Sequence, residues 1–314
     1  EPEMCVETMR MLLARGNRAT LPENRILFYT VVVRHPDLHR WRSLWRGRLP
    51  DTVPTPPWGR AVPEKIFYYA NTVHTANLCL MLNPNDPRPW TALGRVHFEM
   101  RMPAESALNY ETALLFTPDN PVTLHAAGDA YVMLQDYETA ARRFRRALRA
   151  RPDFLPALFS LGETLLQLGR TTEAERLYRD AIGRDPDNAV LWKFLGKTLN
   201  EQGRPTQART AWQHALDLDP HFLEAAGDLA VLLYNTGDID KGIELLEDII
   251  TKAPPGSGLQ ARAAYHLGEA HLAGGRYEPA VSAFKRAVRL APDAPAYRKR
   301  LDEVLEDHDP HRTP

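Results

Sequence analysis

The stretch "AIGRDPDN" (181–188) joins the end of a helix-forming run to a proline turn, and close versions of it recur along the chain. The related stretches are "ALLFTPDN" (113–120), "ALRARPDF" (147–154), "ALDLDPHF" (215–222) and "AVRLAPDA" (287–294). Their prolines belong to a series with a spacing of 34 residues and a last step of 38: Pro84, Pro118, Pro152, Pro186, Pro220, Pro254 and Pro292. Self-similarity at a fixed period of this length indicates a repeat architecture.

The repeat unit contains two helical stripes, which unit 87–120 illustrates. They consist of Trp90, Leu93 and His97, followed by Ser106, Tyr110 and Ala113. A small residue lets two helices approach closely, and a large residue fills the space beside it. The small position on the first helix holds Gly94, Gly128, Gly162, Gly196, Ala230 and Gly268, and the large position on the second holds Tyr110, Phe144, Tyr178, Trp212, Leu246 and Phe284.

This pattern resembles the tetratricopeptide repeat (TPR) family across residues 84–294. The six units are 87–120, 121–154, 155–188, 189–222, 223–256 and 261–294. The resemblance implies an all-α fold, a right-handed α-solenoid of antiparallel helix hairpins. Neighbouring hairpins are then expected to bury one another's apolar faces, since one hairpin alone cannot bury its own. The recurring proline ends each second helix and starts the turn into the next unit.

The residues outside the repeats predict caps at both ends. Residues 1–83 indicate an irregular helical N-terminal region, in which "EKIFYYANTVHTANLCLMLNP" (64–84) has the pattern of a second helix. Residues 295–307 predict an amphipathic C-terminal capping helix that opens on a proline. Residues 308–314 indicate a disordered tail.

The segment 41–63 is rich in Trp, Pro and Arg, and its prolines exclude one long helix. Disorder is one interpretation, and two others stay open beside it. The tryptophans seal the first hairpin as part of an irregular cap, or the segment docks a partner or an anionic surface. Arg and Trp are enriched at binding hot spots. The docking candidates are Trp41, Trp45, Arg46 and Trp58.

The fifth unit departs from the pattern. Ile249 replaces a small residue, Gly242 replaces alanine, and the stretch with "PPGSG" (254–258) adds four residues before the next unit. A larger residue in a close-packed seam pushes helices apart. We therefore expect a local change in the curvature of the solenoid at this unit.

Composition excludes several classes of protein. The 314 residues are 44% hydrophobic and carry a net charge of -1, which does not favour a nucleic-acid partner. No apolar run approaches the roughly 18 residues that span a bilayer. The only cysteines, Cys5 and Cys79, exclude a disulfide framework and a thiolate-rich zinc site. Each is interpreted as a small buried hydrophobe, with a single bridge as the alternative.

The high ratio of Arg to Lys is typical of a GC-rich, bacterial genome. The sequence opens with Glu1 rather than Met. We therefore expect that an upstream segment, such as a signal peptide or a membrane anchor, has been removed. The expected location is the bacterial cytoplasm or periplasm, with a membrane tether as the alternative.

The sequence lacks the usual catalytic motifs. It has no P-loop, dinucleotide-binding glycine pattern or nucleophile elbow. His266 and His271 are five residues apart, so they do not share a helical face as metal ligands do. His35 and His39 are separated by Pro36, which breaks the helix that would align them. We predict a non-catalytic protein with no cofactor and no metal.

The TPR resemblance implies a concave groove, lined by the first helices, that accepts a peptide. The groove candidates are Arg95, Phe98, His125, Asp129, Phe159, Glu163, Lys193, Lys197, Asn200, Tyr234, Tyr265 and Glu269. The sequence does not match the carboxylate clamp of chaperone-binding relatives, because Lys197 and Asp228 stand where that clamp needs asparagines. The asparagine ladder of the sugar transferases is absent as well. Apolar anchors among both signs of charge suit a peptide of alternating apolar and polar character.

The predicted function is a TPR adaptor or scaffold that binds a protein segment in its groove and supports the assembly of a complex. One alternative is the recruitment domain of a membrane-anchored enzyme or assembly factor, of glycosyltransferase or cytochrome-maturation type. Another is a structural subunit that associates with copies of itself.

Overall fold

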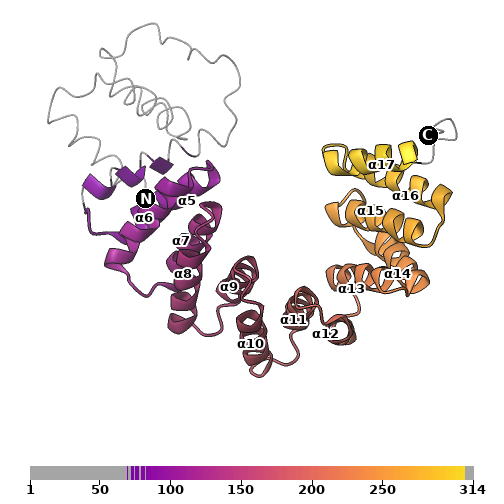
Figure 1. Cartoon of the computed structure of the whole chain (residues 1–314). Helices are drawn as coiled ribbons and strands as arrows, with labels where there is room; N and C mark the ends of the chain where they lie inside the picture. The colour runs from indigo at the N-terminus through magenta and orange to yellow at the C-terminus, as the bar shows by residue number, and fades with distance from the viewer. Residues whose placement is uncertain (1–68, 70–71, 74, 78, 82, 308–314) are drawn as a thin grey trace, which may run out of the picture. The chain divides into compact units, whose positions relative to one another are not determined.

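The computed structural model describes residues 69, 72–73, 75–77, 79–81 and 83–307, and within them every regular element is an α-helix (Figure 1). The predicted all-α fold is therefore confirmed. The helices are α5 (Pro87–Glu99), α6 (Pro103–Phe116), α7 (Pro121–Met133), α8 (Tyr137–Ala150), α9 (Leu155–Gln167), α10 (Thr171–Ile182), α11 (Ala189–Glu201), α12 (Pro205–Leu218), α13 (Leu223–Asn235), α14 (Ile239–Lys252), α15 (Gly258–Ala273), α16 (Tyr277–Leu290) and α17 (Pro295–Asp307). The described residues between 69 and 81 are also helical.

Several sequence predictions lie outside the described residues. They concern Cys5, the docking candidates Trp41, Trp45, Arg46 and Trp58, and the tail 308–314. These stay predictions. Cys79 is described and is half-buried.

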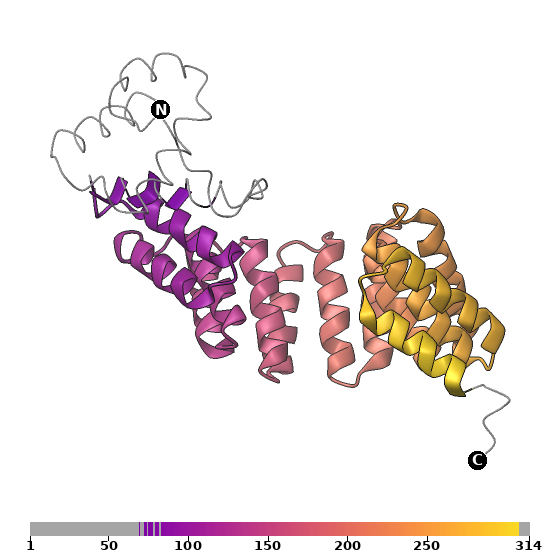
Figure 2. The same cartoon turned by 90° about the horizontal axis from the view of Figure 1, so that it is seen from above.

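The chain divides into two compact units, residues 1–164 and 165–314, and each is described by itself. In the N-terminal unit α5 packs against α6, α6 against α7, and α7 against α8. In the C-terminal unit each helix from α10 to α17 packs against the next one along the chain. Figure 2 shows α17, in yellow, beside the orange helices that precede it. Each hairpin thereby covers the apolar face of its neighbour.

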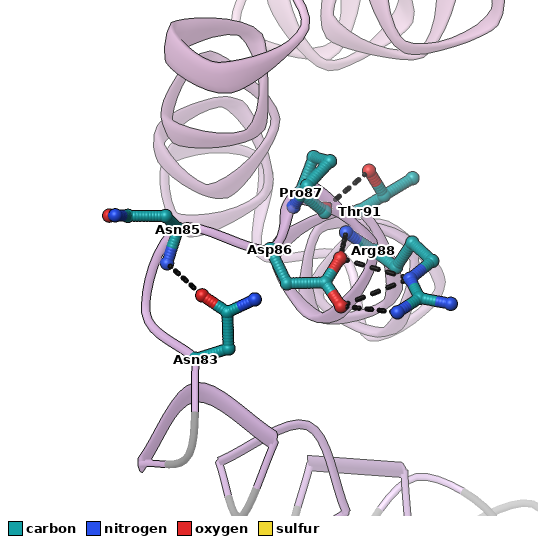
Figure 3. Close-up of polar contacts among 6 residues, drawn as sticks. All are labelled: Asn83, Asn85, Asp86, Pro87, Arg88 and Thr91. Carbon is teal, nitrogen blue, oxygen red and sulfur yellow. Dashed lines mark hydrogen bonds and ion pairs between the residues drawn. The ribbon is translucent and has the colours of Figure 1, made fainter.

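Several helix starts are fixed by local side-chain caps, and α5 shows how (Figure 3). Asp86 accepts a hydrogen bond at 2.9 Å from the backbone N–H of Arg88, and the Arg88 guanidinium returns to the same carboxylate at 2.7 Å. These hydrogen bonds lower the pKa of Asp86. Pro87 occupies the first turn, where a missing N–H costs nothing. Asn120, Asn188 and Ser257 cap α7, α11 and α15 in the same way.

The recurring proline has a second role, which two tryptophans reveal. The indole N–H of Trp192 donates to the carbonyl of Pro186 at 2.8 Å, and that of Trp90 donates to the carbonyl of Pro84 at 3.2 Å. Each bond ties a first helix to the turn that precedes it. The proline ring fixes that turn, so the acceptor carbonyl is held in place.

The turn inside each hairpin places one residue in the left-handed region. Glycine fills this position in four hairpins, at Gly169, Gly203, Gly237 and Gly275. In the first two hairpins Arg101 and Gln135 adopt the same conformation, with φ of 60° and 61°. A side chain there meets the backbone carbonyl, so these two turns carry strain that the glycine turns lack.

Helix pairs meet where a glycine faces a buried ring. A Cβ at Gly196 would lie 2.6 Å from Trp212, and one at Gly94 or Gly268 would lie 2.7 Å from the facing ring. At Gly128 the added atom would overlap Phe144, whose side chain is fully buried. These contacts confirm the small–large interpretation for these four pairs, in which the rings occupy the volume that a side chain would need.

The fifth hairpin solves the same packing problem with different volumes. Ala230 and Leu246 replace the glycine and the ring, and both are fully buried. The closest backbone approach moves to Gly242, where a Cβ would lie 3.0 Å from the carbonyl oxygen of Ala230. Ile249 is buried in the same core as Leu246. The expected change in curvature at this unit stays a prediction.

Candidate protein-binding surface

The first helices of the C-terminal unit carry a row of polar and aromatic side chains. We call this set the C-terminal first-helix face: Lys193, Lys197, Asn200, Asp228, Tyr234, Arg262, Tyr265, His266 and Glu269. Contacts between α11, α13 and α15 hold the row together. The Lys193 ammonium lies 3.6 Å from the Asp228 carboxylate, and the Tyr234 hydroxyl lies 3.2 Å from Nδ1 of His266.

The Lys193–Asp228 pair is largely satisfied within the chain. The Lys193 side chain is 19% exposed, and its ammonium lies 4.5 Å from the centre of the Phe194 ring. Burial raises the pKa of Asp228, and the charges of Lys193, Arg262 and Lys197 oppose that rise. A partner therefore meets a compensated pair at this point.

Beside Asp228 lies a small pocket between α13, α14 and α15, with a volume of about 90 Å³. Its apolar wall comes from Val231, Leu246, Ile249 and Leu259, among others. The charged and polar wall comes from Asp228, Arg262 and His266. Small-molecule sites span roughly 300–1,000 Å³. This pocket is therefore sized for one side chain.

The pocket exists because the fifth unit carries a glycine where the other units carry larger residues. Gly227 stands at the repeat position that holds Thr91, His125, Phe159, Lys193 and Tyr265 in the other units. A Cβ on Gly227 would have only Ile249 within 4 Å, at 3.8 Å. Val231 likewise stands where the other units have charged residues. The irregular unit thus opens a recess at a repeat position where the other units carry side chains.

The Tyr234–His266 pair lies next to this pocket and is half-buried. Burial lowers the pKa of His266, the Arg262 charge lowers it further, and Glu269 opposes them. Burial also raises the pKa of Tyr234 to about 12. Both groups are therefore neutral at physiological pH and act as hydrogen-bonding groups.

Helix α17 completes the row from the C-terminal side. The Arg300 guanidinium donates to both oxygens of Glu269, at 2.7 and 3.1 Å, and these bonds raise the pKa of Arg300. The rings of Tyr265 and Tyr297 stack with their centres 5.0 Å apart. Burial, followed by the nearby Glu269, raises the pKa of Tyr265. The Glu269 charge is thus compensated by α17.

In the N-terminal unit His125 is the centre of a similar set of contacts. Its Nδ1 lies 3.3 Å from Asp129, and its Nε2 lies 3.1 Å from the hydroxyl of Ser160. The imidazole also contacts the rings of Phe144 and Phe154. Burial raises the pKa of Asp129, and His125 opposes the rise. These contacts fix the imidazole between two first helices, α7 and α9.

The other predicted groove residues of this unit are placed less centrally. Arg95 is exposed and lies 4.0 Å from Glu99. Phe98 is half-buried against the core around Leu124, and Phe159 and Glu163 are half-buried on α9. These side chains present only part of their surface to a partner.

The structure brings some predicted residues together and adds others. His125 and Asp129 form one predicted pair, and Tyr265 interacts with Glu269. Tyr297, Arg300 and His266 are not among the predicted groove residues. The sequence signal for the pocket is Gly227, a glycine at a repeat position where the other units carry larger residues.

Two further features concern metal ions and membranes. Among the residues that the structure describes, no group of three or more His, Cys, Asp or Glu is placed to hold a metal ion. None of the helices in that part of the chain is long and apolar enough to cross a membrane.

Comparisons with known proteins identify the family. Sequence profiles described as tetratricopeptide repeat match residues 125–189, 199–262 and 257–295. Together these matches cover more than half of the chain, so the chain belongs to the TPR family. No curated protein matches the sequence. Membership of this family supports a role as a protein-interaction scaffold.

Solved structures agree with the fold. A TPR protein from Parabacteroides merdae matches with a TM-score of 0.63 at 18% identity, covering 77% of this chain and 94% of that chain. Pseudomonas aeruginosa pilF matches with a TM-score of 0.52 at 19% identity, covering 69% and 97%. A thermophilic TPR protein of Thermus thermophilus matches at 0.51 and 21% identity, covering 59% and 98%. At these identities the likeness shows the fold alone.

Proposed function

We propose that the chain is a non-catalytic TPR adaptor that binds a segment of another protein at the C-terminal first-helix face and supports assembly of a complex. The pocket beside Asp228 is the observation that carries this proposal. It combines an apolar wall with a charged rim and has room for one side chain. Pockets of this kind anchor peptides, because one buried side chain supplies much of the affinity and the rim sets the register.

The chemistry of the face defines the segment that fits it. Val231 and Leu259, the part-exposed apolar residues of the pocket, suit an aliphatic or aromatic side chain, and the buried Leu246 and Ile249 lie behind them. On the rim, Lys193 compensates Asp228, while Arg262 is exposed. Hydrogen bonds to Asn200 or the Tyr234–His266 pair then suit polar neighbours of the anchor. The preferred ligand is an apolar residue flanked by polar or acidic ones.

The experiment is a selection of peptides from a random displayed library against the full chain, followed by calorimetry on the winners. The variant Gly227→Tyr fills the pocket with the residue that the sixth unit carries at the same position, Tyr265. We expect at least about a tenfold loss of affinity, because the anchor loses its site. Val231→Lys, which copies Lys197 of the fourth unit, is expected to act in the same direction.

The matched control is Leu108→Thr/Leu115→Thr, which changes an exposed surface on α6 and leaves the pocket intact. Peptides that bind Gly227→Tyr as tightly as the unmodified chain would show that the pocket is not the site. Failure to select any peptide would also count against the proposal. Circular dichroism establishes that the variants are folded.

A further inference from the structure

A second surface lies on α6 and α8 of the N-terminal unit and is independent of the C-terminal first-helix face. On α6 the side chains of Leu108 and Leu115 are 68% and 76% exposed. They stand seven residues apart, which places them on the same side of the helix, two turns from each other. Solvent-exposed leucines in such a pair form an apolar ridge.

The repeat register shows that these leucines are not required for folding. The position of Leu108 corresponds to Arg142, Arg176, Thr210, Glu244 and Ser282 in the later second helices. The position of Leu115 corresponds to Arg149, Gly183, Asp217, Thr251 and Arg289. All of these residues are exposed. The solenoid thus accepts polar residues at both positions, and α6 departs from its siblings by presenting leucine.

The same two positions on α8 are basic, and an ion pair connects α8 to α6. Arg143 donates to both oxygens of Glu111 on α6, at 2.6 and 2.9 Å, and Arg146 donates to Asp119 at 3.1 Å. Glu111 lies between Leu108 and Leu115 in the sequence of α6. The apolar ridge and the row Arg142–Arg149 are therefore neighbours. Helix α8 contains five arginines and one glutamate, although the whole chain has a net charge of -1.

We propose that Leu108 and Leu115, with Arg142 and Arg149, form a docking surface for an amphipathic helix of a partner protein whose apolar ridge is flanked by carboxylates. Two leucines separated by two turns match the spacing of a helix ridge that packs alongside. The planar guanidinium of arginine binds carboxylates in a bidentate manner. Charge complementarity therefore predicts carboxylates along the flank of the partner helix.

A protein helix fits this surface better than an anionic membrane. Glu111 and Asp119 lie within the surface and already hold Arg143 and Arg146. An anionic bilayer would place its negative potential against those two carboxylates. A discrete helix can instead direct its carboxylates to Arg142 and Arg149 and place its apolar ridge on the leucines.

The test uses two synthetic helical peptides with leucine at every seventh position, one with glutamates along the flank and one with lysines. Binding to the full chain is measured by fluorescence anisotropy at low and at high salt. We expect the glutamate peptide to bind and the lysine peptide to fail, with affinity falling as salt is added. Binding to vesicles of equal parts phosphatidylcholine and phosphatidylglycerol is measured alongside, to test whether the surface binds a membrane instead.

The variants copy residues that sibling units carry at the same positions. Leu108→Thr/Leu115→Thr follows Thr210 and Thr251, and Arg142→Glu/Arg149→Asp follows Glu244 and Asp217. Each pair is expected to weaken the glutamate peptide by about tenfold or more, because each removes one half of the surface. The charge variant is also expected to improve binding of the lysine peptide.

The control pair is Ser282→Glu/Arg289→Asp, which introduces the same two acidic residues at the corresponding positions of α16 and is expected to leave binding unchanged. Equal binding of both peptides, binding to vesicles alone, or binding to neither would overturn the proposal. A concentration-dependent dimer that Leu108→Thr/Leu115→Thr abolishes would assign the surface to a second copy of the chain and would overturn it as well. Gly227→Tyr, which tests the other face, leaves this result unaffected.

Discussion

At the scale of single residues, glycine positions determine how closely two helices approach. Gly128 and Phe144 illustrate the constraint, since a methyl group on the glycine would overlap a ring that has no room to move. Buried rings at native packing density transmit such an overlap to their surroundings. The fifth hairpin, with Ala230 and Leu246, shows the alternative distribution of volume.

We therefore predict that Gly128→Ala lowers the free energy of unfolding by about 1–3 kcal/mol. Adding Phe144→Leu is expected to restore part of that loss, because the smaller side chain leaves space for the methyl group, as Leu246 does beside Ala230. Urea denaturation of the two single variants and the double variant measures the coupling.

The control for this series is Gly258→Ala, since an added Cβ there meets nothing within 4 Å. It is expected to be neutral or slightly stabilising. A double variant that is simply the sum of its parts would contradict the volume argument.

A second prediction at this scale concerns the buried histidine of the C-terminal unit. Burial holds the pKa of His266 below its ordinary value of 6.5, so the unfolded chain binds the proton more readily than the folded chain. The stability that this group contributes is complete above the unfolded pKa and is lost as pH falls through it toward the folded pKa. We expect unfolding to become easier between about pH 7 and pH 5.

His266→Asn keeps a hydrogen-bonding partner for Tyr234 but cannot titrate. The variant is expected to show a shallower loss of stability over that range, measured as the midpoint of thermal unfolding against pH. Burial also lowers the pKa of His271, so part of the dependence remains. Asp228, whose pKa burial raises, contributes with the opposite sign. An unchanged slope in His266→Asn would contradict the assignment.

At the scale of helices and turns, the period in the sequence predicted much of what the structure contains. Proline spacing and small–large alternation predicted the helical repeats, because these features act locally or within one hairpin. The Lys193–Asp228 pair joins two successive first helices, and the Glu269–Arg300 pair joins a first helix to α17. Both pairs therefore depend on the angle between hairpins. That angle is set by the packing of whole helices, which no residue spacing specifies.

The turns inside the hairpins give a prediction at the same scale. Gln135 adopts a left-handed conformation that four sibling turns assign to glycine. Gln135→Gly is therefore expected to stabilise the N-terminal unit by about 0.5–1 kcal/mol, since relief of the strain exceeds the added freedom of the unfolded chain. Chemical denaturation measures the gain.

Gln135→Ala is the matched control, because it removes the side chain beyond Cβ and keeps the strain. It is expected to give no gain. Equal stabilisation by alanine and glycine would show that side-chain contacts, and not the backbone conformation, set the energy of this turn.

At the scale of the whole molecule, the helices α5 to α8 in one unit and α10 to α17 in the other pack mainly against their neighbours in the sequence. The stability of such a chain is close to a sum over hairpins and their interfaces. We therefore predict that Gly268→Ala, which forces a methyl group against Phe284, reduces hydrogen-exchange protection in α15, α16 and α17. Protection in α5 to α8 is expected to stay unchanged. A uniform loss of protection across both units would contradict this expectation.

The fifth hairpin has Ala230 in place of the glycine and Leu246 in place of the ring. This exchange of side-chain volumes also limits how such a gene can change by recombination. A first helix with glycine, joined to the second helix that carries Leu246, would leave a void between them. A first helix with Ala230, joined to a second helix that carries a ring, would produce a clash. Crossovers that fall between hairpins keep each matched pair intact, whereas crossovers within a hairpin separate it. The heritable module of this chain is therefore the hairpin, and copying or exchanging modules preserves the fold only when the breakpoints fall in the proline turns.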